Sequence, residues 1–162
     1  MIALAMMHEP ALIVADEPTS ALDVTLQAQM LDLLATARDE TGAALILVSH
    51  DLGVIAQIAD RVAVMYAGRV IEEAAVSALF ARPRHPYTAD LLASVPTLRD
   101  VPGELSVIGG QPPDRVATTG CAFEPRCPVG RGEAACCIDR PPLVGRAHRV
   151  ACHVARFGPE PT

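Results

Sequence analysis

An apolar run, Ala11–Ala15, leads directly into two acidic residues, Asp16 and Glu17. Its length and composition predict a strand buried on both faces of a sheet. A second such run, Leu45–Val48, ends at Ser49 and His50. Between the two runs, apolar residues recur at helical spacing before Gly42, a plausible C-cap: Leu26, Met30, Leu33, Leu34 and Ala37. A strand, a helix and a strand in this order predict an α/β fold with a parallel sheet and crossover helices.

The acidic pair lies where α/β sheets bind ligands, at the carboxyl end of a strand. A carboxylate there can hold Mg2+ through its water shell, and a second can polarise a water for attack on a phosphate. Asp16 and Glu17 suit these two roles. A bare Asp-Glu pair is more often a solvated strand end, so the surrounding sequence has to decide between the two interpretations.

The rest of the chain falls into two parts. Residues 52–59 resume a helical period, and residues 61–66 and 69–72 flank Ala67-Gly68, which predicts a hairpin. From Pro96 onward prolines and glycines become dense and periodicity fades. We therefore expect a boundary near Val95 to Val101, with an α/β part over residues 1–95 and a loop-rich part over residues 96–162.

Composition narrows the classes of function. The net charge of −6 disfavours a basic surface for nucleic acid, and the sequence contains no lysine. No apolar stretch approaches the length of a membrane span. All five cysteines lie between Cys121 and Cys152. An odd number of thiols without a secretion signal favours a reducing compartment and argues against a disulfide framework.

The stretch Ala11–Asp23 resembles the Walker B motif and D-loop of ABC-family ATPases, and Leu45–Asp51 resembles their switch strand with its histidine. The resemblance implies ATP and Mg2+ as cofactors. It implies that Asp16 is linked to Mg2+, that Glu17 is the catalytic glutamate and that His50 contacts the γ-phosphate. Ser20 to Asp23 would face a partner subunit, so Ser20 and Asp23 are further nucleotide-site candidates.

Two parts of such an ATPase have no counterpart in this sequence. A phosphate-gripping Gly-rich loop with its lysine is absent, and so is the ABC signature segment. In the family both precede the strand seen here. The resemblance thus implies a C-terminal fragment of an ATPase subunit, inactive by itself. We expect its parallel sheet, deprived of neighbouring strands, to expose apolar edges and to fold marginally.

The later sequence is similar to the extension that follows the ATPase core in dipeptide/oligopeptide (and nickel) importer subunits. The segments that carry this similarity are Arg84–Leu98, Gly120–Pro128, Pro141–Leu143 and His148–His153. In several members of that family four tail cysteines bind an iron-sulfur cluster, and the matching residues are Cys121, Cys127, Cys136 and Cys152. Cys137 competes for the third place. A [4Fe-4S] cluster, Zn2+ and free structural thiols all stay open, with His148 and His153 as further zinc ligands or ordinary surface residues.

The resemblance implies a peripheral subunit at the cytoplasmic face of the bacterial inner membrane. Its partners would be a second ABC ATPase subunit, two membrane permease subunits and an external solute-binding protein, with no nucleic acid. The transported substrate would be a dipeptide or oligopeptide, with nickel or another small solute as the alternative. A non-catalytic fragment that binds a metal or a partner is the competing class. A fragment of a DNA-repair ATPase is disfavoured by His85–Thr88 and by the cysteine segment.

Overall fold

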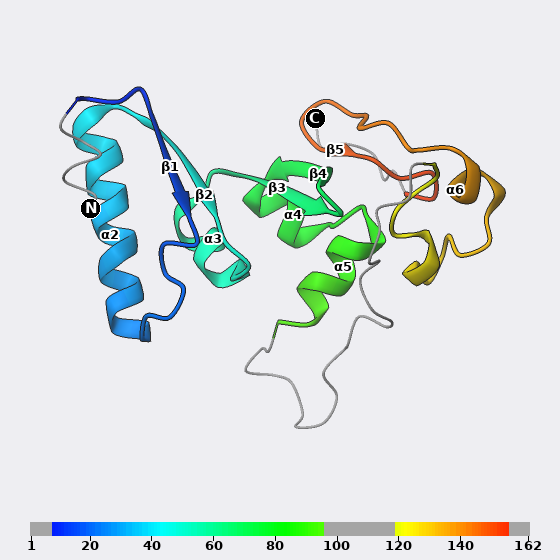
Figure 1. Ribbon diagram of the computed structural model, residues 1–162, viewed down its shortest axis with the longest axis horizontal. Coiled ribbons are helices and arrows are strands. Elements are labelled where there is room, and N and C mark those ends of the chain that lie inside the picture. Colours follow the sequence, from blue (N-terminus) through cyan, green and yellow to red (C-terminus); the bar gives the residue numbers. More distant parts are fainter. Residues whose placement is uncertain (1–7, 96–118, 156–162) are drawn as a thin grey trace. The chain divides into compact units, whose positions relative to one another are not determined.

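The computed structural model describes residues 8–95 and 119–155. The chain divides into two compact units, Met1–Ala59 and Asp60–Thr162. Within the described residues the fold is mixed α/β, with one small parallel sheet and one small antiparallel sheet (Figure 1). This confirms the predicted α/β class. The domain boundary expected near Val95 to Val101 falls almost entirely outside the described residues and stays a prediction.

The first unit contains the predicted strand, helix and strand. Strand β1 (Leu12–Asp16) pairs in parallel with β2 (Ala44–Val48), and helix α2 (Val24–Thr41) connects them. Helix α3 (Leu52–Ile58) follows β2. The register aligns the two strand ends, because the last pair joins Asp16 to Val48. The residues after both strands therefore emerge at one edge of the sheet.

Asp23 and Gly42 set the two ends of α2. Asp23 is the N-cap, and its carboxylate accepts a hydrogen bond from the N–H of Leu26 at 2.9 Å. Gly42 ends the helix in the left-handed conformation, with φ of 66°, as predicted.

The prediction of which face of α2 is buried was wrong in part. Leu31 and Leu34 are buried, whereas Leu33 is 51% exposed.

The expectation that β1 and β2 are buried on both faces was also wrong. Burial alternates along each strand, and one face leaves four apolar side chains about half exposed: Leu12, Val14, Ile46 and Val48. Successive side chains of a strand point to opposite faces, so a single covered face gives this alternation. Among the described residues nothing buries the second face. The sequence predicted exposed edges of this sheet, whereas the exposure described here is that of a face.

The second unit begins with the predicted hairpin. Strands β3 (Arg61–Tyr66) and β4 (Arg69–Ala75) are antiparallel, and the register shifts between Val64 and Met65. Both turn residues have positive φ, 48° at Ala67 and 75° at Gly68, as a tight hairpin turn requires. The elements that follow are short: α4 (Val76–Ala81), α5 (Pro86–Ala93), η1 (Glu124–Arg126), α6 (Ala134–Ile138) and β5 (Arg149–Val150).

The end of the chain returns to the hairpin as a third strand. β5 pairs with β4 through Glu72↔Val150 and Glu73↔Arg149. Phe123, which is 1% exposed, packs edge-on against Tyr66 and Tyr87 at ring-centre distances of 5.3 and 5.4 Å. Aromatic contacts of this geometry contribute beyond the area that they bury. Segments far apart in sequence thus share one core, which the sequence pattern did not predict.

A buried carboxylate ties this core together. Glu72 has no exposed surface; its Oε1 accepts from the N–H of Arg84 at 2.7 Å, and its Oε2 accepts from the N–H of His85 at 3.0 Å. Nε2 of His148 lies 2.6 Å from Oε1. The side chain of His148 is 8% exposed, so its interpretation as a surface histidine was wrong. Buried charges persist only when paired and hydrogen-bonded, and Glu72 meets both conditions.

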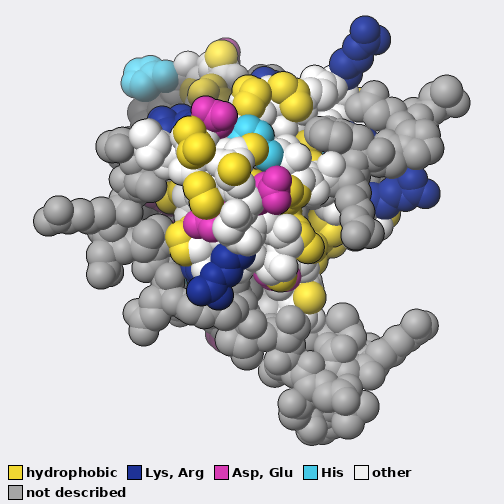
Figure 2. All heavy atoms as spheres, turned by 90° about the vertical axis from the view of Figure 1, so that its right-hand side faces the viewer, with side chains coloured by type: hydrophobic (Ala, Val, Ile, Leu, Met, Phe, Trp, Pro, Cys, Tyr) yellow, Lys and Arg dark blue, Asp and Glu magenta, His cyan; other side chains and the backbone are white. Residues whose placement is uncertain are grey.

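The surface shows no single dominant class of side chain on the face drawn in Figure 2. Hydrophobic side chains lie there among acidic and other polar groups, and basic side chains are separated from one another. Within residues 8–95 and 119–155, none of the helices has the length and apolar character of a membrane span.

Replacing Glu72 with Gln should cost about 3 kcal/mol of unfolding free energy, because the amide NH2 group replaces one accepting oxygen and leaves at least one of the three donors without an acceptor. The matched control is Glu73→Gln. Glu73 pairs with Arg61 and Arg149 nearer the surface, and its loss should cost less than about 1 kcal/mol. Urea unfolding of both variants measures the difference. Equal losses would contradict the role assigned to Glu72.

Candidate functional site

Glu17 leaves the line of β1 immediately after the strand ends. Its φ is 45°, a left-handed conformation that is uncommon for a residue other than glycine. Its N–H donates to the carbonyl of Val48 at 2.9 Å, which extends the parallel pairing by one step. Strained backbone of this kind costs on the order of 1–3 kcal/mol and gathers at functional sites. The conformation therefore marks Glu17 as a candidate for function.

The side chain of Glu17 meets His50, which follows β2. Nδ1 of His50 lies 2.9 Å from Oε1 of Glu17, and both side chains are accessible, at 78% and 44% exposure. The hydrogen bond to Glu17, helped by the charges of Glu17 and Asp51, raises the pKa of His50 above its ordinary value of 6.5. The structure thus brings together the two residues that the sequence predicted to be catalytic.

A cavity of about 240 Å³ opens beside this pair. Its walls come from the segments after β1 and β2 and from α2: Glu17, Thr19, Ser20, Ala21, Leu22, Gln27, Ser49, His50 and Asp51. Asp51 is the N-cap of α3, where it accepts from the N–H of Gly53 at 2.8 Å. Gln27 donates to the other oxygen of Asp51 at 3.3 Å. The sequence pattern did not single out Gln27 or Asp51, although an Asp two residues before a glycine at a helix start is a capping signal.

The other predicted nucleotide-site residues have different surroundings. Asp16 ends β1 on the exposed face and does not line the cavity. Ser20 does, and its hydroxyl donates to the carbonyl of Glu17 at 2.9 Å. Asp23 caps α2, which gives its carboxylate a structural partner. Ser20 therefore fixes the turn that carries Glu17, and Asp23 fixes the helix that follows it.

The pair of Glu17 and His50 resembles a general base with a partner that orients it. An accessible carboxylate beside an imidazole can hold a water and accept its proton. The sequence contains no lysine that could grip a phosphate beside this carboxylate–imidazole pair.

The cysteines of the second unit divide into a gathered group and one outlier. Cys127 and Cys136 are buried, Cys121 and Cys152 are half-buried, and Cys137 is exposed. Burial, followed by the charges of Cys121, Cys152 and Cys127, raises the pKa of Cys136 to about 11. A methyl group on Gly130 would lie 3.2 Å from the sulfurs of both Cys127 and Cys136. Of the two competing residues, Cys136 thus lies with the other three cysteines and Cys137 does not.

This gathering does not amount to a metal site as it stands. Across residues 8–95 and 119–155, no three His, Cys, Asp or Glu side chains are arranged to hold a metal ion. His153, named as a further zinc ligand, is engaged elsewhere, because its Nε2–H donates to the carbonyl of Asp139 at 2.8 Å. His148 pairs with Glu72. Among the described residues neither histidine belongs to a group of three side chains that could hold a metal ion.

Comparison with known proteins covers nearly the whole chain. The oligopeptide transport ATP-binding protein OppD of Mycobacterium bovis is 50% identical over 156 residues, 94% of this chain and 25% of that protein. The probable peptide ABC transporter ATP-binding protein y4tS of Sinorhizobium fredii is 50% identical over 159 residues, 94% of this chain and 44% of that protein. The dipeptide transport ATP-binding protein DppD of Bacillus subtilis is 51% identical over 129 residues, 79% of this chain and 38% of that protein.

All three of these relatives are ATP-binding proteins of peptide transport, which is the class of protein that the chain resembles. A family model described as "Oligopeptide/dipeptide transporter, C-terminal region" matches residues 71–136, which run from β4 to α6. Over those residues the chain is similar to the C-terminal region of oligopeptide/dipeptide transporters, and over most of its length it is similar to the ATP-binding proteins named above. It spans between a quarter and about half of the length of the relatives it matches.

Replacing Glu17 with Gln should lower the pKa of His50 toward 6.5, because it removes the carboxylate that stabilises the imidazolium. In the parent protein the raised pKa means that the pair stabilises the fold most below about pH 6.5 and less as pH rises through the pKa of His50. NMR titration of the imidazole signals measures the shift. Glu40→Gln, an exposed acid on α2, is the control and should leave the titration unchanged; an unchanged midpoint in Glu17→Gln would refute the pairing.

Alkylation should separate the cysteines. In metal-free buffer at about pH 8, Cys137 should react with iodoacetamide at least about tenfold faster than Cys136, since Cys136 is buried and its pKa is about 11. Mass spectrometry of the digested protein gives the rate at each thiol. The variant Cys137→Ser should lose only the fast-labelled site. Equal rates at Cys136 and Cys137 would show that the buried thiol group is not formed.

Proposed function

We propose that the chain supplies the hydrolytic side of an ATP site in an importer of dipeptides or oligopeptides. The observation that carries the proposal is the contact between Glu17 and His50 at the aligned ends of two parallel strands. The peptide transport proteins that match the chain at about 50% identity support the class of transporter.

The residues would divide the chemistry as follows. Asp16 would hold Mg2+ through water, Glu17 would accept a proton from the attacking water, and His50 would orient that water and contact the γ-phosphate. The left-handed backbone at Glu17 supports this division, because it turns the carboxylate from the strand toward His50. Ser20 and Asp23 would present the turn after β1 to a second ATPase subunit.

The phosphate loop and its lysine have to come from outside this sequence, which has no lysine. The isolated chain should therefore show no ATP turnover. By similarity to the peptide transport proteins, its partners would be a second ATP-binding subunit, two permease subunits and an external solute-binding protein. It would act at the cytoplasmic face of the membrane. Nickel or another small solute is the alternative cargo.

A second role rests on the gathered thiols. The four cysteines Cys121, Cys127, Cys136 and Cys152 would hold a [4Fe-4S] cluster, or Zn2+, as the non-catalytic function of this part of the chain. Their charges act on one another, which supports the group, but the described side chains do not form a ready ligand set. Iron, sulfide and zinc contents of the anaerobically purified protein decide between the metals, and a metal-free protein would reject both.

The hydrolytic role can be tested in a chimera. Residues of this chain would replace the matching region of the Bacillus subtilis dipeptide transport protein, to which they are 51% identical over 129 residues. We expect the chimera to restore dipeptide uptake in cells that lack that protein. Glu17→Gln in the chimera should lower ATP turnover by at least about a hundredfold, as expected for loss of a general base.

The control for the chimera is Glu40→Gln, which removes one exposed carboxylate of α2 away from the cavity. It should keep parental uptake and turnover. A chimera that binds its partners yet retains turnover in Glu17→Gln would reject the role of Glu17. A chimera that is well folded but inactive in every form would favour the non-catalytic alternative.

A further inference from the structure

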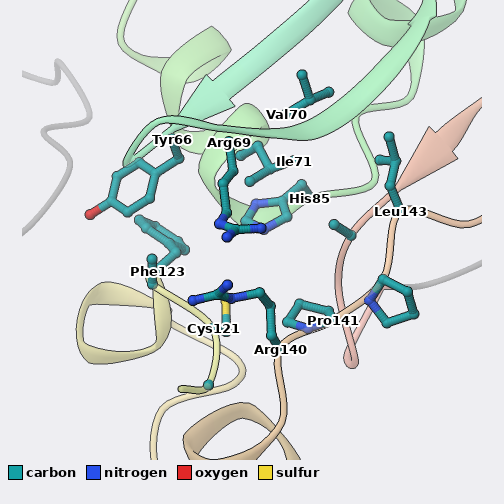
Figure 3. Close-up of a pocket in the computed structure, with 14 residues that line it drawn as sticks. Tyr66, Arg69, Val70, Ile71, His85, Cys121, Phe123, Arg140, Pro141 and Leu143 are labelled. Atoms are coloured by element: carbon teal, nitrogen blue, oxygen red, sulfur yellow. The ribbon is translucent and has the colours of Figure 1, made fainter. Parts of the chain in front are cut away.

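The second unit contains a cavity that the proposed ATP chemistry does not use. Its volume is about 370 Å³, within the range of small-molecule sites. Its walls come from β4, from the N-cap of α5, from residues 120–123 before η1 and from residues 140–143 after α6 (Figure 3). Tyr66, Ile71, Phe123, Pro141 and Leu143 make much of this lining apolar.

His85 gives the cavity a buried donor. This residue is 1% exposed and is the N-cap of α5, where its Nδ1 accepts a hydrogen bond from the N–H of Tyr87 at 3.0 Å. Burial lowers the pKa of His85 to about 4, so the ring is neutral near pH 7. With Nδ1 as the acceptor, the proton of the neutral ring is on Nε2. That atom has no hydrogen-bond partner in the part of the chain that the structure describes.

Leaving a buried N–H group unsatisfied is costly, so an unpaired donor on a residue that lines a cavity indicates an acceptor that belongs there. Two arginines show what kind of acceptor fits. Arg69 and Arg140 both line the cavity, and in Figure 3 their guanidinium groups extend into it from opposite walls. No aspartate or glutamate is among the described lining residues. The nearby acid, Glu72, is buried behind the wall and already accepts from three partners.

We propose that this cavity binds a small carboxylate with an apolar body, of the size of an aromatic acid. The carboxylate accepts from Nε2–H of His85 and from the guanidinium groups of Arg69 and Arg140. Guanidinium groups match carboxylate geometry in a bidentate manner. The apolar body lies against Phe123, Tyr66 and the prolines that precede Leu143. The site lies in the second unit and is independent of Glu17 and His50.

The test uses the full chain and benzoate as the probe. Benzoate should bind saturably and shift the Nε2–H signal of His85 in NMR spectra. Benzyl alcohol, a neutral molecule of similar shape, and acetate, a carboxylate without the ring, should each bind at least about tenfold more weakly. That factor corresponds to the loss of one charge-assisted hydrogen bond or of one apolar contact surface.

The variants Arg69→Gln and Arg140→Gln should each weaken benzoate binding at least about tenfold. Arg131→Gln is the control for lost charge, because Arg131 is exposed and does not line the cavity. Unchanged thermal midpoints establish that the variants fold.

Three results would overturn the proposal. Equal binding of benzyl alcohol and benzoate would show an apolar void with no preference for an anion. Equal binding by inorganic phosphate would show a simple anion site without a place for an apolar body. Benzoate binding that neither Arg69→Gln nor Arg140→Gln weakens, or no binding at all, would leave the arginines and His85 without the assigned role.

Discussion

Glu72 joins three parts of the second unit that are separated in sequence. Its carboxylate oxygens accept from the backbone N–H groups of Arg84 and His85, and it pairs with His148 next to β5. A fully buried carboxylate is costly to desolvate, so it stabilises only the one arrangement that supplies all of these partners. The return of the chain end to β4 and the start of α5 therefore depend on the same side chain. The adjacent Glu73 makes only surface pairs and constrains much less.

One consequence is the placement of His85. Because Glu72 holds the backbone N–H of His85, the ring is fixed at the start of α5 and its Nδ1 caps Tyr87. The remaining ring nitrogen has no hydrogen-bond partner among the described residues, and His85 lines the large cavity. Arg69, at the first position of β4, enters the same cavity from the strand that carries Glu72. The buried contact between Glu72 and His148 and the proposed carboxylate site are thus parts of one arrangement around β4.

Local pattern was enough to predict the strands and helix of the first unit and the hairpin of the second, but not how either unit packs. The strand, helix and strand around Asp16 and His50 follow from composition, capping and periodicity, all of which act over a few residues. The contact between Glu17 and His50 could be predicted because parallel strands bring their carboxyl ends together. The exposed face of β1 and β2 could not be predicted, since apolar strand residues do not reveal how many neighbours cover them. The pairing of β5 with β4 and the packing of Phe123 join residues far apart in sequence, which no local signal marks.

The histidines show why residue type alone did not assign roles. His50 is open to solvent beside a carboxylate, so its pKa is raised and its charge is available for chemistry. His85 is buried at a helix start, so its pKa falls and it acts as a neutral donor. His148 is buried as well, but it meets Glu72 and becomes part of the core. In the sequence each is a histidine near polar residues. Burial and the nearest charge, which only the fold determines, separate a catalytic candidate, a ligand donor and a structural partner.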